Sequence, residues 1–222
     1  TAPRPRGVFV TGTAPEVGKT VVSALRCARY RREVPLAYWK PIASGAVEGR
    51  DVETVAELSG VETVDEHVLL RDPLSPHLAA RLEGRTIDPD AVVADFRRHS
   101  AGDRALIVEG AGGVYVPLTD DGAMLLDLLP RLGLPAVVVS RSALGTINHT
   151  LLTLEALRAR GVEVAGVVFT GAANPENSEA IRRFGQVEIL GHLPILDPLD
   201  RTALEDWSRR FDLGGQLLPW LT

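Results

Sequence analysis

The sequence predicts an α/β fold, a doubly wound, mainly parallel sheet with helices on both faces, in a single domain spanning residues 1–222. Short apolar runs of strand length alternate with amphipathic stretches of helix length, as in β-α-β units. Two runs, Ala105–Gly110 and Pro135–Ser140, are continuously apolar, as expected for central strands that are covered on both faces. No internal repeat or shift in composition divides the chain, so one domain is expected.

Local signals support the individual elements. Asp88 is suited to cap a helix whose first residue is Pro89, and the helix that begins at Thr146 stops before Gly161. Residues 1–6 are expected to be flexible, and residues 197–222 to form a C-terminal segment of helix and loop. The other expected strands are Gly7–Thr11, Val34–Lys40, Val162–Thr170 and Glu188–Pro194, and the other expected helices are Lys19–Arg32, Asp51–Leu58 and Asp206–Phe211.

Composition excludes several classes of partner. The net charge of −5 argues against a nucleic-acid-binding surface as the main function. No apolar run approaches the roughly 18 residues that a membrane span needs, and the N-terminal residues have no apolar core of a signal peptide. Cys27 has no second cysteine to pair with, which fits a reducing cytoplasm.

The stretch TGTAPEVGKT, residues 11–20, ends like a phosphate-binding loop. It follows an apolar strand and opens a helix, so backbone N–H groups and the helix dipole would face an anion. Lys19 would neutralise phosphate and the Thr20 hydroxyl would bind Mg²⁺, whereas the alternative is a polar loop with a chance Gly-Lys-Thr. The opening glycine is Gly12, one residue earlier than the usual spacing. The loop makes the expected fold one of P-loop NTPase type.

Three charged residues stand where the expected strands end or helices begin. Glu109 ends the run ALIVEG and is a candidate Mg²⁺ ligand, with room for a ligand beside the glycines of the following GAGG. Asp51 is either a second carboxylate of that site or an ordinary helix N-cap. Lys40 is either a surface lysine or a cation directed at a transferring phosphoryl group. The five histidines show no metal-ligand spacing.

Several separated motifs together resemble one family. TGTAPEVGKT, WKPIASG, the aspartate of GRD, SPHLAARLEG, VEGAGG and LGTINHTLLT occur in this order in dethiobiotin synthetases. The resemblance runs from about residue 7 to residue 196. It implies an ATP- and Mg²⁺-dependent homodimer that carboxylates 7,8-diaminononanoate with CO₂, phosphorylates the carbamate with ATP and closes the ureido ring.

The resemblance also implies roles for single residues. Thr20, Asp51 and Glu109 match the Mg²⁺ positions, and Lys19 and Lys40, with Ser44, match the catalytic positions around phosphate and carbamate. The other implied nucleotide contacts are Thr13, Glu16, Val17, Gly18, Thr170, Gly171 and Pro194. The substrate contacts are Glu16, Lys40, Ser44, Glu109 and Gly112, with Gly145, Thr146 and Asn148 receiving the substrate carboxylate across the dimer interface.

The sequence departs from the family pattern at two places. Thr170-Gly171 stands where many members have Asn-Asp, so selectivity for adenine is expected to be loosened. Pro15 removes an N–H from the loop where the family often has threonine.

Two other functions share this ATP module. A switch ATPase acting through protein partners is disfavoured because Ala14 stands where those proteins carry a second lysine. An amidotransferase-type synthetase would need a glutaminase domain with a cysteine nucleophile, and Cys27 falls inside a helix.

Overall fold

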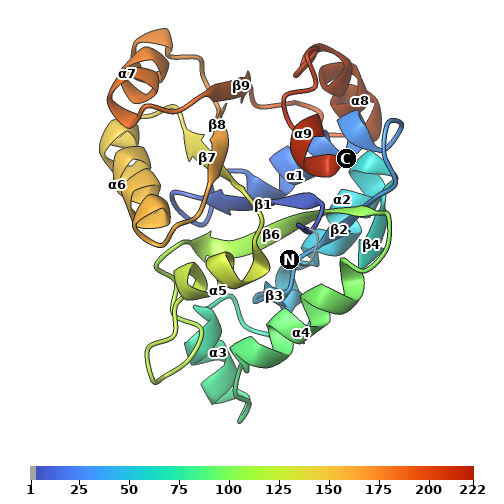
Figure 1. Ribbon diagram of the computed structural model, residues 1–222, viewed down its shortest axis with the longest axis vertical. Coiled ribbons are helices and arrows are strands. Elements are labelled where there is room, and N and C mark those ends of the chain that lie inside the picture. Colours follow the sequence, from blue (N-terminus) through green and yellow to red (C-terminus); the bar gives the residue numbers. More distant parts are fainter. Residues whose placement is uncertain (1–3) are drawn as a thin grey trace.

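The computed structural model describes residues 4–222, and its centre is a sheet of seven parallel strands. The order is β4-β2-β6-β1-β7-β8-β9, so β1 is the central strand (Figure 1). β6, β2 and β4 lie on one side of it, and β7, β8 and β9 lie on the other. β3 (Ile42–Ala43) and β5 (Val68–Leu69) form a separate parallel pair. The seven strands are β1 (Gly7–Gly12), β2 (Leu36–Trp39), β4 (Glu62–Val64), β6 (Ala105–Gly113), β7 (Ala136–Arg141), β8 (Val164–Thr170) and β9 (Ile189–Leu193).

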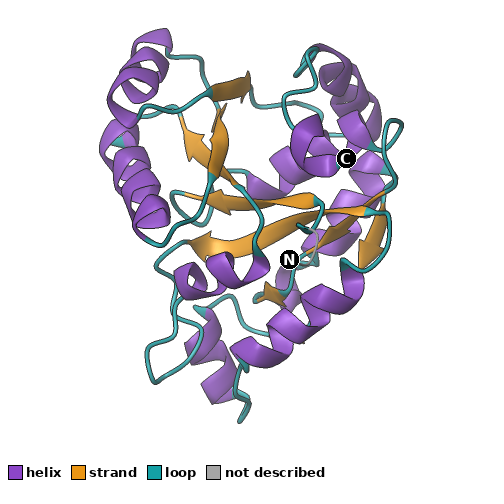
Figure 2. Cartoon of the chain, viewed as in Figure 1, coloured by secondary structure: helices purple, strands orange, loops and turns teal. Residues whose placement is uncertain are grey.

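Helices cover both faces of the sheet (Figure 2), which confirms the doubly wound α/β fold. Each group of helices shares a hydrophobic cluster with one face of the strands. One face packs against α1 (Lys19–Tyr30), α2 (Asp51–Ser59), α8 (Arg201–Arg210) and α9 (Leu218–Leu221). The other packs against α3 (Pro76–Leu82), α4 (Pro89–His99), α5 (Leu125–Leu132), α6 (Thr146–Ala159) and α7 (Pro175–Gly185).

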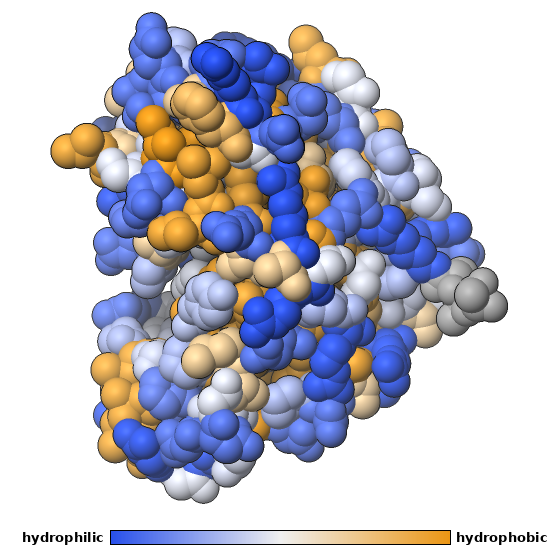
Figure 3. All heavy atoms as spheres, turned by 60° about the vertical axis from the view of Figure 1, so that its left-hand side comes forward, coloured by the Kyte–Doolittle hydropathy of each residue, from blue (hydrophilic) through white to orange (hydrophobic). Residues whose placement is uncertain are grey.

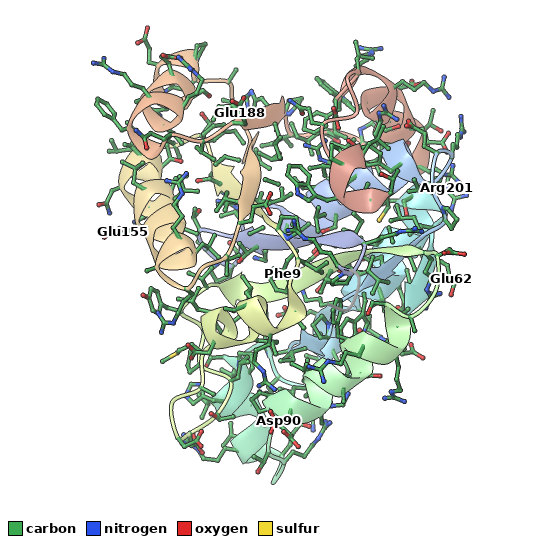
Figure 4. All side chains as sticks on the ribbon, viewed as in Figure 1. Phe9, Glu62, Asp90, Glu155, Glu188 and Arg201 are labelled. Atoms are coloured by element: carbon green, nitrogen blue, oxygen red, sulfur yellow. The ribbon has the colours of Figure 1, made fainter. Side chains whose placement is uncertain are left out.

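The central strand β1 shows why the apolar runs are continuous. Phe9 belongs to the cluster on one face, whereas Val8 and Val10 belong to the cluster on the other. Because side chains alternate along a strand, a strand covered on both faces needs apolar residues at every position. Figure 4 shows Phe9 in the interior of the molecule and the labelled charged residues towards its periphery.

Sequence patterns missed the shorter elements. β3, β4 and β5 have two or three residues each, too few to show a period, and α5 carries Pro130 within it. α3 and α7 were not expected either, although both begin with a proline, at Pro76 and Pro175. No helix within residues 4–222 combines the length and hydropathy that a membrane crossing requires.

The two ends of the chain contact the sheet and its helices. Residues 1–3 of the segment expected to be flexible lie outside the described residues. Of the rest, Arg4 forms an ion pair with Glu163, and the Arg6 carbonyl accepts a hydrogen bond from the Leu106 N–H. Residues 197–222 contain α8, which packs against α1, and α9, which packs against β1 (Figure 1).

A buried ion pair anchors this C-terminal segment to α1. The Arg26 guanidinium lies 3.0 Å from the Asp212 carboxylate, and both side chains have 0% exposure. The Tyr30 hydroxyl donates to the same carboxylate and accepts from the Leu217 N–H. Asp212 has a φ of 61°, a left-handed conformation that its contacts hold in place. The helix that follows the phosphate-binding loop is therefore fixed by the end of the chain.

We predict that Asp212→Ala destabilises the fold by about 3–5 kcal/mol, because the Arg26 charge stays buried without its partner. Chemical denaturation monitored by circular dichroism measures this. Asp206→Ala is the matched control: Asp206 is exposed on α8, 4.0 Å from Arg209, and its loss should change stability by less than about 0.5 kcal/mol. Equal effects of the two substitutions would contradict the anchoring role.

Candidate functional site

The loop between β1 and α1 folds back over its own first glycine. A Cβ atom at Gly12 would lie 2.7 Å from Val17 Cγ2 and 3.1 Å from Lys19 Cδ, so only glycine fits there. Gly18 has a φ of 89°, which also favours glycine, and directs the chain into α1. The loop accommodates the extra residue between these glycines by bringing Val17 and Lys19 back against Gly12.

The Lys19 side chain forms hydrogen bonds with the backbone of this loop. Its ammonium donates to the carbonyls of Ala14 at 3.1 Å and Pro15 at 2.6 Å. Pro15 lacks an N–H, but it contributes to the loop through its carbonyl. Burial lowers the pKa of Lys19 to about 8, although the Glu109 carboxylate opposes this shift. A buried cation with few compensating anions is suited to receive an anionic ligand.

Thr20, Asp51 and Glu109 converge at the start of α1. The Thr20 hydroxyl lies 2.9 Å from Asp51 Oδ1 and 3.0 Å from Glu109 Oε1. A hydroxyl has one proton, so it cannot donate fully to both carboxylate oxygens. A hard cation would complete this arrangement, since Mg²⁺ takes one or two carboxylates and a hydroxyl beside phosphate oxygens and water. The three residues expected to hold Mg²⁺ therefore fit the ion.

Lys40 follows β2 and its ammonium lies between the two carboxylates. It contacts Asp51 Oδ2 and lies 3.0 Å from Glu109 Oε1. Burial alone would lower the pKa of Lys40, but Glu109 and Asp51 outweigh burial and raise the pKa above its usual range. The alternative of a surface lysine is wrong, because the residue is only 8% exposed. Lys40 also holds the pKa of Asp51 below its usual value, against the effect of burial.

Asp51 and Glu109 occupy different local positions from those expected. Asp51 is the first residue of α2 rather than its N-cap, which is Arg50, so its carboxylate is free to reach Thr20 and Lys40. Glu109 does not end its strand, because β6 continues to Gly113, which pairs with Gly12 of β1. Gly110 leaves no room for a ligand: a Cβ there would lie within 3.0 Å of Phe9 and Leu125.

Two further donors to Glu109 were missed in the sequence. Ser23 Oγ and the Tyr38 hydroxyl each lie 2.9 Å from Glu109 Oε2. Burial raises the pKa of Tyr38 well above its usual value, and Glu109 raises it further, so the phenol stays a donor. Spacing could have revealed both residues, since Ser23 lies one helical turn after Thr20, and Tyr38 lies two strand positions before Lys40.

The side chains of Lys19, Thr20, Lys40, Asp51 and Glu109 line a hollow of about 390 Å³. Its lining brings together nine of the residues expected to form the site, namely Glu16, Gly18, Lys19, Thr20, Lys40, Ser44, Asp51, Glu109 and Gly112.

An adjoining hollow of about 530 Å³ lies on the other side of the loop. The loop residues Glu16 and Gly18 line both hollows. Thr170 does not offer its hydroxyl hydrogen to this second hollow, because it donates to the Val17 carbonyl at 2.7 Å. The expected nucleotide contacts in its lining are Glu16, Val17, Gly18, Thr170, Gly171 and Pro194.

Four of the expected site residues line neither hollow. Thr13 and Thr146 take part in a chain of hydroxyls, since Ser140 Oγ lies 3.3 Å from Thr13 Oγ1 and 2.9 Å from Thr146 Oγ1. Thr146 is 5% exposed. Gly145 and Asn148 are exposed at the N-terminus of α6 and do not line the hollow that contains Lys40.

The lysines of the chain are distributed unevenly. The sequence has 24 lysines and arginines, of which only Lys19 and Lys40 are lysines, and both lie in the site. Within residues 4–222 no three His, Cys, Asp or Glu side chains converge, so the candidate Mg²⁺ position combines only two carboxylates with the Thr20 hydroxyl. Cys27 is buried in α1, as a core residue.

The chain is similar to known proteins over most of its length. The model of the AAA domain family matches residues 6–203. The chain is 50% identical to the ATP-dependent dethiobiotin synthetase of Paramagnetospirillum magneticum, covering 85% of this chain and 87% of that one. It is 45% identical to the ATP-dependent dethiobiotin synthetase of Nitrobacter hamburgensis, covering 90% and 91%.

Solved structures are similar in fold. A ParA family ATPase from Chlorobium tepidum has a TM-score of 0.57 at 10% sequence identity, with 98% of this chain and 96% of that chain covered. At this identity the likeness shows a P-loop NTPase fold and nothing of the substrate. The family match and the curated relatives show that this chain belongs to the ATP-dependent dethiobiotin synthetase family.

Proposed function

We propose that this chain uses ATP and Mg²⁺ to join CO₂ to 7,8-diaminononanoate and close the ureido ring of dethiobiotin. One amine takes up CO₂ as a carbamate, whose oxygen attacks the γ-phosphorus of ATP and releases ADP. The second amine then attacks the carbonyl carbon of the carbamic-phosphoric anhydride and releases phosphate. The observation that carries the proposal is the hollow in which Lys19, Lys40 and the cluster of Thr20, Asp51 and Glu109 meet.

The residues of this hollow match the charges of the reaction. Thr20, Asp51 and Glu109 would hold Mg²⁺, which when bound neutralises charge on the phosphates. Lys19 would leave the Ala14 and Pro15 carbonyls for phosphate oxygens. Lys40 lines the same hollow as Lys19, where a carbamate and a γ-phosphate would meet, and its charge would stabilise the transferring group. Ser44 lines the same hollow and would bind the carbamate.

The nucleobase would occupy the second hollow. Thr170 and Gly171 in its lining have no side-chain amide, and the Thr170 hydroxyl already donates to the Val17 carbonyl. Without a paired donor and acceptor, discrimination between bases should be weak.

The carboxylate end of the diamine would be held by a second copy of the chain. Gly145 and Asn148 lie at the exposed N-terminus of α6, where the helix dipole favours a carboxylate. They do not line the hollow that contains Lys40, so a homodimer would supply them from its partner. The face with α6 and α7 shows apolar atoms in its upper part (Figure 3). Leu144, just before α6, Leu152 on α6 and Phe184 on α7 are exposed.

The proposed setting is the cytoplasm, where ATP is available and a lone buried cysteine such as Cys27 stays reduced. Fractionation of the source cells would test this, and recovery outside the cytoplasm would contradict it.

Phosphate release should require both 7,8-diaminononanoate and bicarbonate, as well as ATP and Mg²⁺. A coupled phosphate assay with each component left out in turn measures this, and mass spectrometry identifies dethiobiotin. Release that does not depend on the diamine would contradict the synthetase and favour a switch ATPase.

The two lysines should separate binding from turnover. Lys19→Ala should weaken ATP binding by roughly 10- to 150-fold, the effect of losing a charged hydrogen bond. Lys40→Ala should keep ATP affinity within about threefold but lose roughly 10²–10³ in turnover. Isothermal titration and the phosphate assay measure the two quantities. Lys40→Ala turnover within threefold of wild type would rule out the assigned role.

Selectivity among nucleoside triphosphates should be weak. We expect CTP and GTP to support turnover within about 100-fold of ATP, because sites without base-specific hydrogen bonds discriminate by no more than that. Thr170→Val is the matched variant, and its selectivity should equal that of wild type, since the hydroxyl donates to Val17. A preference for ATP above 10⁴ would show that another group reads the base.

Mixing inactive variants should reveal the shared site. Lys40→Ala and Asn148→Asp would each inactivate a homodimer, but a mixed dimer would keep one intact site. Equal amounts, exchanged to equilibrium, should recover about a quarter of wild-type turnover. No recovery, despite exchange shown by native mass spectrometry, would mean that Asn148 acts within its own chain or not at all.

A further inference from the structure

The Glu109 carboxylate divides its four donors between its two oxygens. Oε1 lies 3.0 Å from the Thr20 hydroxyl and 3.0 Å from the Lys40 ammonium. Oε2 lies 2.9 Å from Ser23 Oγ and 2.9 Å from the Tyr38 hydroxyl. Glu109 has 0% exposure, so no donor from bulk water reaches either oxygen. The two oxygens therefore have different surroundings: one belongs to the site and the other to the protein interior.

Two elements supply both sets of donors. α1 provides Thr20 to one oxygen and Ser23, one turn later, to the other. The β2 strand provides Tyr38 to Oε2, and Lys40, which follows the strand, to Oε1. Because residues two apart on a strand point to the same face, Tyr38 and Lys40 approach the carboxylate from the same side.

The hydroxyls of Tyr38 and Ser23 lie behind the site. Both residues have 0% exposure, and neither lines the hollow. The Tyr38 ring packs in the apolar cluster with Val10, Leu25 and Ile107. A phenylalanine ring would fill the same space, so the hydroxyl is not needed for packing.

We infer that Tyr38 and Ser23 are positioning residues that fix Glu109 Oε2 and thereby present Oε1 alone to the cation. The inference rests on the proposed function for the presence of Mg²⁺ at Thr20, Asp51 and Glu109. An unrestrained carboxylate can rotate or offer both oxygens, whereas Mg²⁺ demands a near-ideal octahedron. Groups that orient a metal ligand change metal affinity or activity by about 10- to 100-fold when removed.

The test compares the variants Tyr38→Phe and Ser23→Ala with Tyr30→Phe. Tyr30 is the matched control, because its buried hydroxyl also donates to a carboxylate, that of Asp212, outside the site. Binding of Mn²⁺ in the presence of ADP is measured by electron paramagnetic resonance. The Mg²⁺ concentration for half-maximal turnover is measured in parallel, and thermal unfolding reports the stability of each variant.

Tyr38→Phe and Ser23→Ala should each raise the Mn²⁺ dissociation constant and the half-maximal Mg²⁺ concentration by about tenfold or more. Tyr30→Phe should lower the melting temperature but leave both metal values within about twofold of wild type, since its hydroxyl does not contact Glu109. If Tyr38→Phe does not fold, Ser23→Ala alone decides.

Metal values within twofold of wild type in both site variants would overturn the inference. So would an equal rise in Tyr30→Phe, which would mean a general loss of stability. Wild-type protein that binds no Mn²⁺ with ADP would overturn it as well. Mn²⁺ binding that weakens as expected, in a protein without diamine-dependent phosphate release, would support the inference and reject the proposed substrate.

Discussion

The interaction on which the site depends is the burial of Glu109 among Thr20, Lys40, Ser23 and Tyr38. A carboxylate with 0% exposure is unfavourable unless its oxygens are paired, and removing one partner leaves a buried charge short of donors. The partners come from α1 and from β2 or the residue after it, whereas Glu109 comes from β6. The neighbouring elements α1 and β2 are therefore held in register with β6, which is distant in the sequence, by the group that the chemistry needs.

Before any ligand is bound, two cations, Lys19 and Lys40, and three carboxylates, those of Glu16, Asp51 and Glu109, line the hollow. A nucleotide with its cation would replace protein contacts with stronger ones, Lys19 exchanging loop carbonyls for phosphate. The fold alone does not distinguish this family from partition ATPases, since a ParA protein has the same fold at 10% identity.

The sequence predicted the sheet, the loop and most of the residues around the first hollow, because each depends on local pattern or on a motif with fixed spacing. The two- and three-residue strands escaped, since they carry no period. Asp51 was ambiguous because an aspartate at a helix start also caps helices, and only the fold brings Lys40 and Thr20 to it. Tyr38 and the Arg26–Asp212 pair depend on contacts between distant segments, which no local pattern contains.

The uneven use of lysine has a chemical consequence. With 22 of its 24 basic residues arginine, the chain carries side-chain amines only at Lys19 and Lys40. Amine-directed reagents would therefore label the site and the α-amino group, with no background from surface lysines. The pKa of Lys19 is lowered to about 8 by burial, whereas the carboxylates raise that of Lys40. At mildly alkaline pH Lys19 would therefore react first. Isotope-labelled methyl groups attached to the Lys19 amine would then give one resolved NMR resonance, whose shift would report the binding of phosphate.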